Sequence, residues 1–102
     1  MYGLYLSSLK DPVTVTLTFN ADRKYIGGDG GCNEYWGEYQ TENSLISFPN
    51  IASTALMCTG SAYHIEDTYL KALGTVQSLK AEKNRLYFLR EEKIVLEFRK
   101  YK

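Results

Sequence analysis

This sequence lacks an excess of charge of either sign. Its 12 basic and 12 acidic residues cancel, so the formal net charge is zero. A neutral chain has no general electrostatic attraction for the phosphates of nucleic acid or for an anionic lipid surface. We therefore expect that nucleic acid is not a partner of this protein.

Long apolar runs are also missing. The longest weakly polar stretch, residues 51–57, is far shorter than the roughly 20 apolar residues of a membrane-spanning helix, so we expect no transmembrane segment. The first residues show no basic region followed by an apolar run, and no signal peptide is visible. We expect a cell-envelope location, periplasmic or lipid-anchored, if an export signal has been removed, and a cytoplasmic one otherwise.

Histidine and cysteine, the residues that most often build metal and catalytic sites, are scarce. There is one histidine, His64, and there are two cysteines, Cys32 and Cys58. Structural zinc takes four ligands, and these residues supply three. We expect neither a metal nor another cofactor.

Ser61, His64 and Asp67 have the residue types of a catalytic triad, at spacings of three. A triad needs a chain of hydrogen bonds from nucleophile to base to orienting acid. Successive turns of one helix rarely provide that geometry, and Ser61 is also suited to capping the helix. We expect no catalytic residues and a protein that is not an enzyme.

The glycine-rich segment at residues 27–33 resembles a phosphate-binding loop only superficially. It contains four glycines in five residues but lacks the Lys-Ser/Thr ending of a P-loop, and no convincing helix follows it. We expect a tight turn or bulge between two strands. At its exit, Asn33 is predicted to act structurally, because asparagine tolerates left-handed backbone and bonds to nearby main chain.

Tyrosine is plentiful, with nine copies, and favours β structure. Residues 13–19 alternate apolar and hydroxyl side chains, as in a strand with one buried face. Strands are also predicted at 35–40, at 45–48 with an end at Pro49, and, weakly, at 76–81. Residues 86–89 and 94–98 are predicted to pair as a hairpin across Glu91–Lys93.

One helix is predicted, at residues 62–73. Its apolar residues Ala62, Ile65, Tyr69, Ala72 and Leu73 share a face at helical spacing. Ser61 is predicted to be its N-cap, with Glu66 and Asp67 early in the helix, and Gly74 is predicted to end it in a left-handed conformation.

The fold class expected from this pattern is α+β and mainly β, in a single domain spanning residues 1–102. A compact antiparallel sheet would be rolled into a barrel-like or sandwich form with one helix packed on it. We expect a monomer.

Tyr35, Trp36 and Tyr39 form an aromatic group in a predicted strand. Alternation puts Tyr35 and Tyr39 on one face and Trp36 on the other. Core packing is expected for at least one face, and we predict a contact patch for an unidentified protein or small molecule at these three residues.

Motifs in a fixed order give the chain a family resemblance. Gly31-Cys32-Asn33 is followed by Gly37-Glu38-Tyr39, then by Thr54-Ala55-Leu56-Met57-Cys58, and then by a helix that contains Glu66. This order resembles the META domain (HslJ-like heat-shock protein) family over residues 13 to 99. The chain departs from the family pattern in lacking a tryptophan in residues 1–9 and in having Ala55 where a basic residue follows the threonine.

The resemblance implies a compact β-rich fold with one helix, in which Gly31, Asn33, Thr54 and Glu66 belong to a structural motif. It also implies that Cys32 and Cys58 form a disulfide or a close pair. Two buried thiols are the alternative.

Many members of the family resemble envelope proteins or lipoproteins, and heat shock and drug tolerance are associated with it. We therefore expect a non-enzymatic, envelope-associated stress-response or binding module. The alternatives are an accessory structural domain of a larger lipoprotein and a small hydrolase-type enzyme.

Overall fold

The computed structural model describes residues 2–4, 15–58 and 60–100. Within these ranges the chain forms eight strands and one helix. In chain order they are β1 (Tyr2–Leu4), β2 (Thr16–Asn20), β3 (Tyr25–Asp29), β4 (Glu34–Glu42), β5 (Leu45–Ser53), α1 (Ser61–Leu73), β6 (Ser78–Glu82), β7 (Arg85–Arg90) and β8 (Lys93–Lys100).

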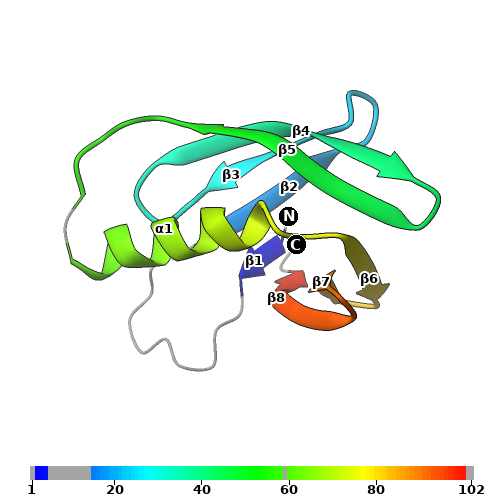
Figure 1. Cartoon of the computed structure of the whole chain (residues 1–102). Helices are drawn as coiled ribbons and strands as arrows, with labels where there is room; N and C mark the ends of the chain where they lie inside the picture. The colour runs from blue at the N-terminus through cyan, green and yellow to red at the C-terminus, as the bar shows by residue number, and fades with distance from the viewer. Residues whose placement is uncertain (1, 5–14, 59, 101–102) are drawn as a thin grey trace.

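Each strand pairs with the next one along the chain in antiparallel orientation, and β8 also pairs with β1. The link between β5 and β6 is narrow, because Leu45 opposite Ser78 is its one register pair. The sheet is thereby rolled into two facing layers, β2 to β5 on one side and β6 to β8 with β1 on the other (Figure 1). The predicted fold class, a mainly-β antiparallel sheet with one helix, is confirmed.

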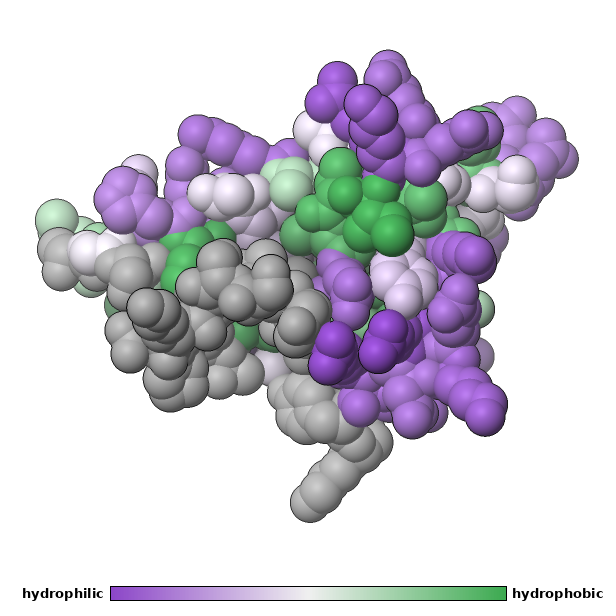
Figure 2. All heavy atoms as spheres, turned by 90° about the horizontal axis from the view of Figure 1, so that it is seen from below, coloured by the Kyte–Doolittle hydropathy of each residue, from purple (hydrophilic) through white to green (hydrophobic). Residues whose placement is uncertain are grey.

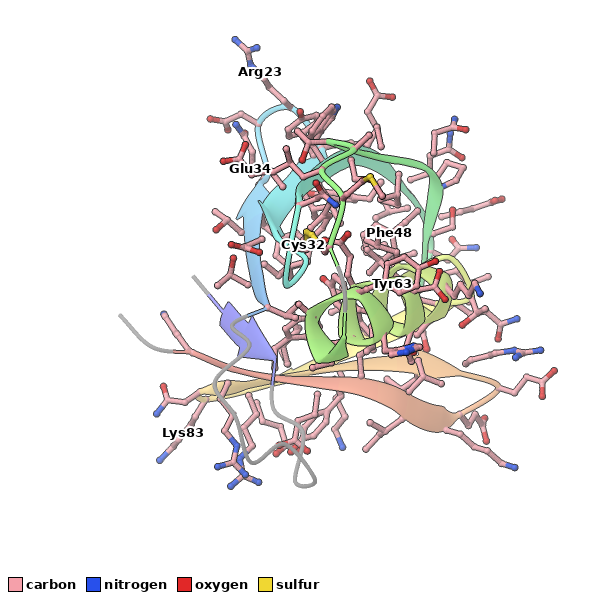
Figure 3. All side chains as sticks on the ribbon, turned by 90° about the vertical axis from the view of Figure 1, so that its left-hand side faces the viewer. Arg23, Cys32, Glu34, Phe48, Tyr63 and Lys83 are labelled. Carbon is pink, nitrogen blue, oxygen red and sulfur yellow. A yellow bond between two sulfur atoms is a disulfide. The ribbon has the colours of Figure 1, made fainter. Side chains whose placement is uncertain are left out.

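The helix α1 lies between these two layers at one end of the molecule, as the two side views in Figures 1 and 3 agree. Tyr69 and Leu73 are fully buried there, and Ile65 and Ala72 pack against the same core. This is the helix face predicted from the sequence. The strands contribute the other buried side chains, which include Leu17, Ile26, Tyr35, Ile46, Phe48, Leu86, Phe88, Leu96 and Phe98.

The helix ends at Leu73 as predicted, but both of its predicted caps need correction. The helix starts at Ser61, so the N-cap position belongs to Gly60, and no acidic residue lies in the first turn. Gly74 is right-handed, with φ −67° and ψ −15°, and not left-handed. Helix-like turns continue beyond Gly74. The Thr75 N–H donates to the Ala72 carbonyl at 3.0 Å, and the Val76 N–H donates to the Leu73 carbonyl at 3.3 Å. A chain that continues in this way needs no reversal at Gly74.

The predicted end of a strand at Pro49 is wrong, since β5 runs on to Ser53. Between the register pairs Glu38↔Asn50 and Gln40↔Ser47 the ladder contains a bulge. Two residues of β5, Phe48 and Pro49, thus lie opposite one residue of β4. Proline lacks an N–H, and a bulge is one of the few places in a sheet that tolerate it.

The glycine-rich segment also divides differently from the prediction. Gly27, Gly28 and Asp29 belong to strand β3, and the turn is confined to residues 30–33. Of the strand predicted at 13–19, residues 13 and 14 lie outside the described residues. The hairpin of β7 and β8 is confirmed, and Glu91 and Glu92 in its turn have φ values of 51° and 67°.

The outer side of the β6 to β8 layer faces the viewer in Figure 2. Hydrophilic side chains dominate it, and hydrophobic surface is gathered in one area. Leu79, Ile94 and Val95 are the exposed large apolar residues of these strands. None of the helices in the described part of the chain is long and apolar enough to cross a membrane.

Candidate functional site

The turn between β3 and β4 is shaped by its own backbone and by Asp29. The Gly30 N–H donates to the Asn33 carbonyl at 2.8 Å, and the Gly31 N–H donates to Asp29 Oδ1 at 2.8 Å. Gly31 has φ 117°, a conformation that side chains disfavour and glycine adopts freely. The next two backbone N–H groups, those of Cys32 and Asn33, are turned toward the helix.

The Glu66 side chain of α1 receives both of these N–H groups. Its Oε1 accepts from the Asn33 N–H at 2.6 Å and from the Cys32 N–H at 3.2 Å. Its Oε2 accepts from Asn33 Nδ2 at 2.8 Å. Glu66 is only 8% exposed, and a β-carbon at position 30 would lie 2.8 Å from Oε1, so Gly30 leaves the space that the carboxylate occupies.

The Asn33 amide extends this connection to the segment that follows β5. Its Oδ1 accepts from the Leu56 N–H at 2.8 Å and from Thr54 Oγ1 at 2.9 Å. Its Nδ2, besides donating to Glu66, lies 3.5 Å from the Leu56 carbonyl. Asn33 therefore joins three separate pieces of chain: the glycine turn, residues 54–56 and helix α1.

A disulfide between Cys32 and Cys58 adds a covalent link between the glycine turn and the segment that precedes α1. Their α-carbons are 6.3 Å apart, within the range that a disulfide spans. The pairing expected from the family resemblance is thus confirmed, and Figure 3 shows Cys32 at the turn beside the helix. Together, Cys32, Asn33, Thr54, Cys58 and Glu66 form what we call the clamp.

The clamp leaves little unused bonding capacity. Both Glu66 oxygens, the Asn33 amide and the Thr54 hydroxyl all have hydrogen-bond partners within it. Across the described residues, no buried side-chain nitrogen or oxygen lacks a partner. Buried polar groups that are fully satisfied in this way fix the relative position of the elements that carry them. The geometry therefore agrees with the structural role predicted for Asn33.

A second buried polar contact lies deeper in the core, between Tyr35 of β4 and Tyr69 of α1. Their hydroxyl oxygens are 2.6 Å apart, and the Tyr35 hydroxyl also donates to the Thr16 carbonyl at 2.7 Å. Burial is the main cause that raises the pKa of both phenols well above the usual tyrosine value. The hydrogen bond from Tyr69 lowers the pKa of Tyr35 in part, and the negative charge of Asp29 raises it further.

The contact patch predicted at Tyr35, Trp36 and Tyr39 needs correction. Tyr35 is 1% exposed, because its side of β4 faces the helix. Tyr39 is half-buried, with its ring centroid 5.6 Å from that of Phe19. Trp36 points to the outer face and is 38% exposed, so of the three it alone presents a large surface to solvent.

Sequence reasoning missed Tyr25, which is 37% exposed on the same outer face. In β3, Tyr25 and Asp29 alternate with the buried Ile26 and the close-packed Gly28, and this period-two pattern was the available signal. The signal was hidden because the glycines made residues 27–33 resemble one long turn.

The contacts of His64 and Asp67 give no support to a triad, and the Ser61 side chain lies outside the described part of the structure. The Asp67 carboxylate pairs with Lys71 Nζ at 2.9 Å, one turn further along the helix. The His64 ring is exposed and packs against Tyr63, with centroids 5.7 Å apart. For metal binding, no cluster of three or more His, Cys, Asp or Glu residues occurs in the described ranges.

These features define a class of protein: a small, mainly-β domain in which one helix lies between two layers. Glu66 of the helix bonds to the glycine turn, and a disulfide links the same turn to the segment before the helix. The META domain model matches residues 6–102, and the chain belongs to the META domain family. The resemblance inferred from the motif order is confirmed.

Two solved structures are similar to this chain. One is the NMR structure of a protein from Burkholderia xenovorans, with a TM-score of 0.73 and 21% identity, covering 96% of this chain and 79% of the other. A second NMR structure has a TM-score of 0.65 and 20% identity, covering 96% of this chain and 86% of the other. At these identities the likeness establishes the fold alone. No curated protein sequence matches the chain.

Proposed function

We propose that this META domain is a non-enzymatic binding domain of the bacterial cell envelope. The observation that carries the proposal is the clamp itself. Asn33 and Glu66, the polar motif residues with the most chemistry to offer, direct their side chains to each other and to nearby backbone. Groups used in this way hold the fold together, and a general base or nucleophile needs a free face toward its substrate.

The surroundings of His64 support the same proposal. A catalytic histidine is usually oriented by a carboxylate or a carbonyl. The nearest acid along its helix face, Asp67, is engaged with Lys71. Trp36 is 38% exposed on the outer face, and tryptophan is enriched where proteins meet their partners.

The envelope location is supported by the Cys32–Cys58 disulfide. Structural disulfides persist in oxidising compartments such as the periplasm and are rare in the bacterial cytoplasm, where thiols are kept reduced. The disulfide links the segment before α1 to the glycine turn, and such a cross-link stabilises a small domain, whose core supplies limited stability by itself.

A hydrolase screen of the oxidised protein, run beside His64→Ala, tests the absence of catalysis. We expect no turnover that depends on His64, and reproducible turnover that His64→Ala abolishes would refute the proposal. Thiol alkylation in intact cells of the source organism tests the location. Both cysteines should stay unlabelled until a reductant is added, and complete labelling without reductant would place the protein in the cytoplasm.

A further inference from the structure

The outer face of β3 and β4 carries two partly exposed aromatic rings, Trp36 and Tyr25. Trp36 lies opposite Gly27 on one side and Ala52 on the other, so its two cross-strand neighbours are small. Tyr25 is exposed on the same face, two residues before Gly27. The small neighbours leave the Trp36 ring accessible in a sheet whose inner face is tightly packed.

Carboxylates surround these rings. Asp29 and Glu34 lie directly opposite each other in the β3–β4 ladder, next to Trp36, and Glu38 lies opposite Tyr25. Figure 3 shows Glu34 on the outer side of the sheet, while Phe48 points into the core. Within the described residues, the ion pairs are Lys71–Asp67, Lys80–Glu82 and Arg99–Glu97, so neither Glu34 nor Glu38 has a cation of its own.

An open hollow of about 450 Å³ joins the two kinds of group. Its lining combines both rings with two carboxylates and includes no basic side chain: Tyr25, Gly28, Asp29, Glu34, Tyr35 and Trp36. Arg23 lines a separate hollow with Asn20, Tyr25 and Glu38, and its side chain extends beyond the tip of the hairpin (Figure 3).

We propose that this hollow binds a cationic side chain, lysine or arginine, of a basic peptide segment. The inference rests on the proposed function, since it assigns a ligand class to a binding domain. A cation over the face of an indole ring is attracted by its π electrons, and carboxylates at the rim add charge complementarity.

The spacing favours a peptide over a single amine. Glu34, Trp36 and Glu38 alternate along β4, so Glu34 and Glu38 are about 13 Å apart at the rise of an extended strand. An extended peptide with basic residues four positions apart matches both carboxylates and passes over the ring between them.

The test uses Trp36 as its own reporter, because it is the only tryptophan in the chain. The oxidised protein is titrated with a short lysine- and arginine-containing peptide while tryptophan fluorescence is recorded at low and high salt. We expect a saturable change that weakens as salt rises. The same titration is made with a glutamate peptide of equal length and with a neutral oligosaccharide.

Two variants with the same change in charge locate the site. Glu34→Gln should weaken binding about fivefold, as expected for losing one rim charge beside a cation–π contact. Glu92→Gln, in the exposed β7–β8 turn, should leave affinity unchanged. Circular dichroism confirms that both variants fold.

Three results would overturn the ligand class: no saturable change with the basic peptide, equal weakening by both variants, or a stronger response to the glutamate peptide or the oligosaccharide. The last of these would still support a binding domain at Trp36, so it leaves the proposed function standing. Turnover in the hydrolase screen would refute the proposed non-enzymatic function but would leave the peptide-binding site untouched.

Discussion

The Glu66 carboxylate accepts hydrogen bonds from both the main-chain N–H and the side-chain amide of Asn33, at 2.6 and 2.8 Å. These two residues are 33 positions apart in the chain. Their contact joins the helix to the glycine turn, and it gives a physical reason for the order of motifs in the sequence. Asparagine supplies donors and acceptors on one side chain, and glutamate supplies two acceptors, so the pair satisfies itself in a buried place.

Asn33→Ala should lower the free energy of unfolding by about 2–4 kcal/mol, because Glu66 Oε2 and the Leu56 N–H both lose their partner in a buried site. This exceeds the roughly 1 kcal/mol that a typical single hydrogen bond contributes. Urea denaturation measures it, with replacement of the exposed Asn50 of β5 by alanine, Asn50→Ala, as the control. An Asn33→Ala midpoint equal to that of the control would argue for a side chain that faces a ligand.

Gly30→Ala should also destabilise the fold, by about 1–3 kcal/mol, although the change adds a single methyl group. That methyl would lie 2.8 Å from Glu66 Oε1 and would push the carboxylate off the two backbone N–H groups. Gly27→Ala is the matched control, since its methyl meets ordinary contacts at 3.4 Å and beyond. Equal thermal midpoints for the two variants would show that Glu66 moves aside freely.

Replacing both cysteines, Cys32→Ala with Cys58→Ala, should cost about 3.5 kcal/mol, the chain-entropy value for a loop of this length. The hydrogen bonds of Asn33 and Glu66 remain, so the far-ultraviolet circular dichroism spectrum at 25 °C should keep its β-rich shape. Treating the wild type with reductant should lower its stability equally. A double variant that is as stable as the oxidised wild type would show that the disulfide contributes nothing.

Stability should fall at alkaline pH because of Tyr35 and Tyr69, whose pKa values burial raises in the folded state. Their contribution is complete below the unfolded tyrosine pKa of about 10 and is lost as pH rises toward the folded values, because the unfolded chain releases its phenol protons first. Tyr35→Phe should flatten the decline between about pH 10 and 12 in urea titrations, and the exposed Tyr63→Phe should not. Parallel declines in all three proteins would contradict the assignment.

Much of the fold follows from local pattern. The helix face of Ile65, Tyr69 and Leu73 and the hairpin of β7 and β8 are confirmed, because strong periodicity and turn chemistry determine both. The predictions that failed are those that depend on tertiary contacts. Pro49 continues a strand because a bulge in β4–β5 accommodates it, and Gly28 lies in a strand at a point where the Thr16 backbone approaches too closely for a side chain.

The sequence allowed us to predict which residues belong to the clamp, but not which contacts they make with one another. The order of the motifs identified Cys32, Asn33, Cys58 and Glu66. Their spacing does not predict that a helix carboxylate accepts hydrogen bonds from a turn 33 residues away. Within the predicted aromatic patch, Tyr35 proves to be buried for a related reason. Alternation correctly separated Trp36 from Tyr35, yet which face of β4 meets the helix depends on how the sheet rolls.

A double-mutant cycle with Asn33→Ala and Glu66→Ala tests most directly the claim that the motif is a clamp. Each variant and the double variant are unfolded in urea, and the coupling energy is the departure from additivity. We predict that Asn33 and Glu66 are coupled by about 1–3 kcal/mol, so that the second replacement costs much less once the first is made. Costs that add to within about 0.5 kcal/mol would contradict the account, since they would show that the two side chains stabilise the fold independently of each other.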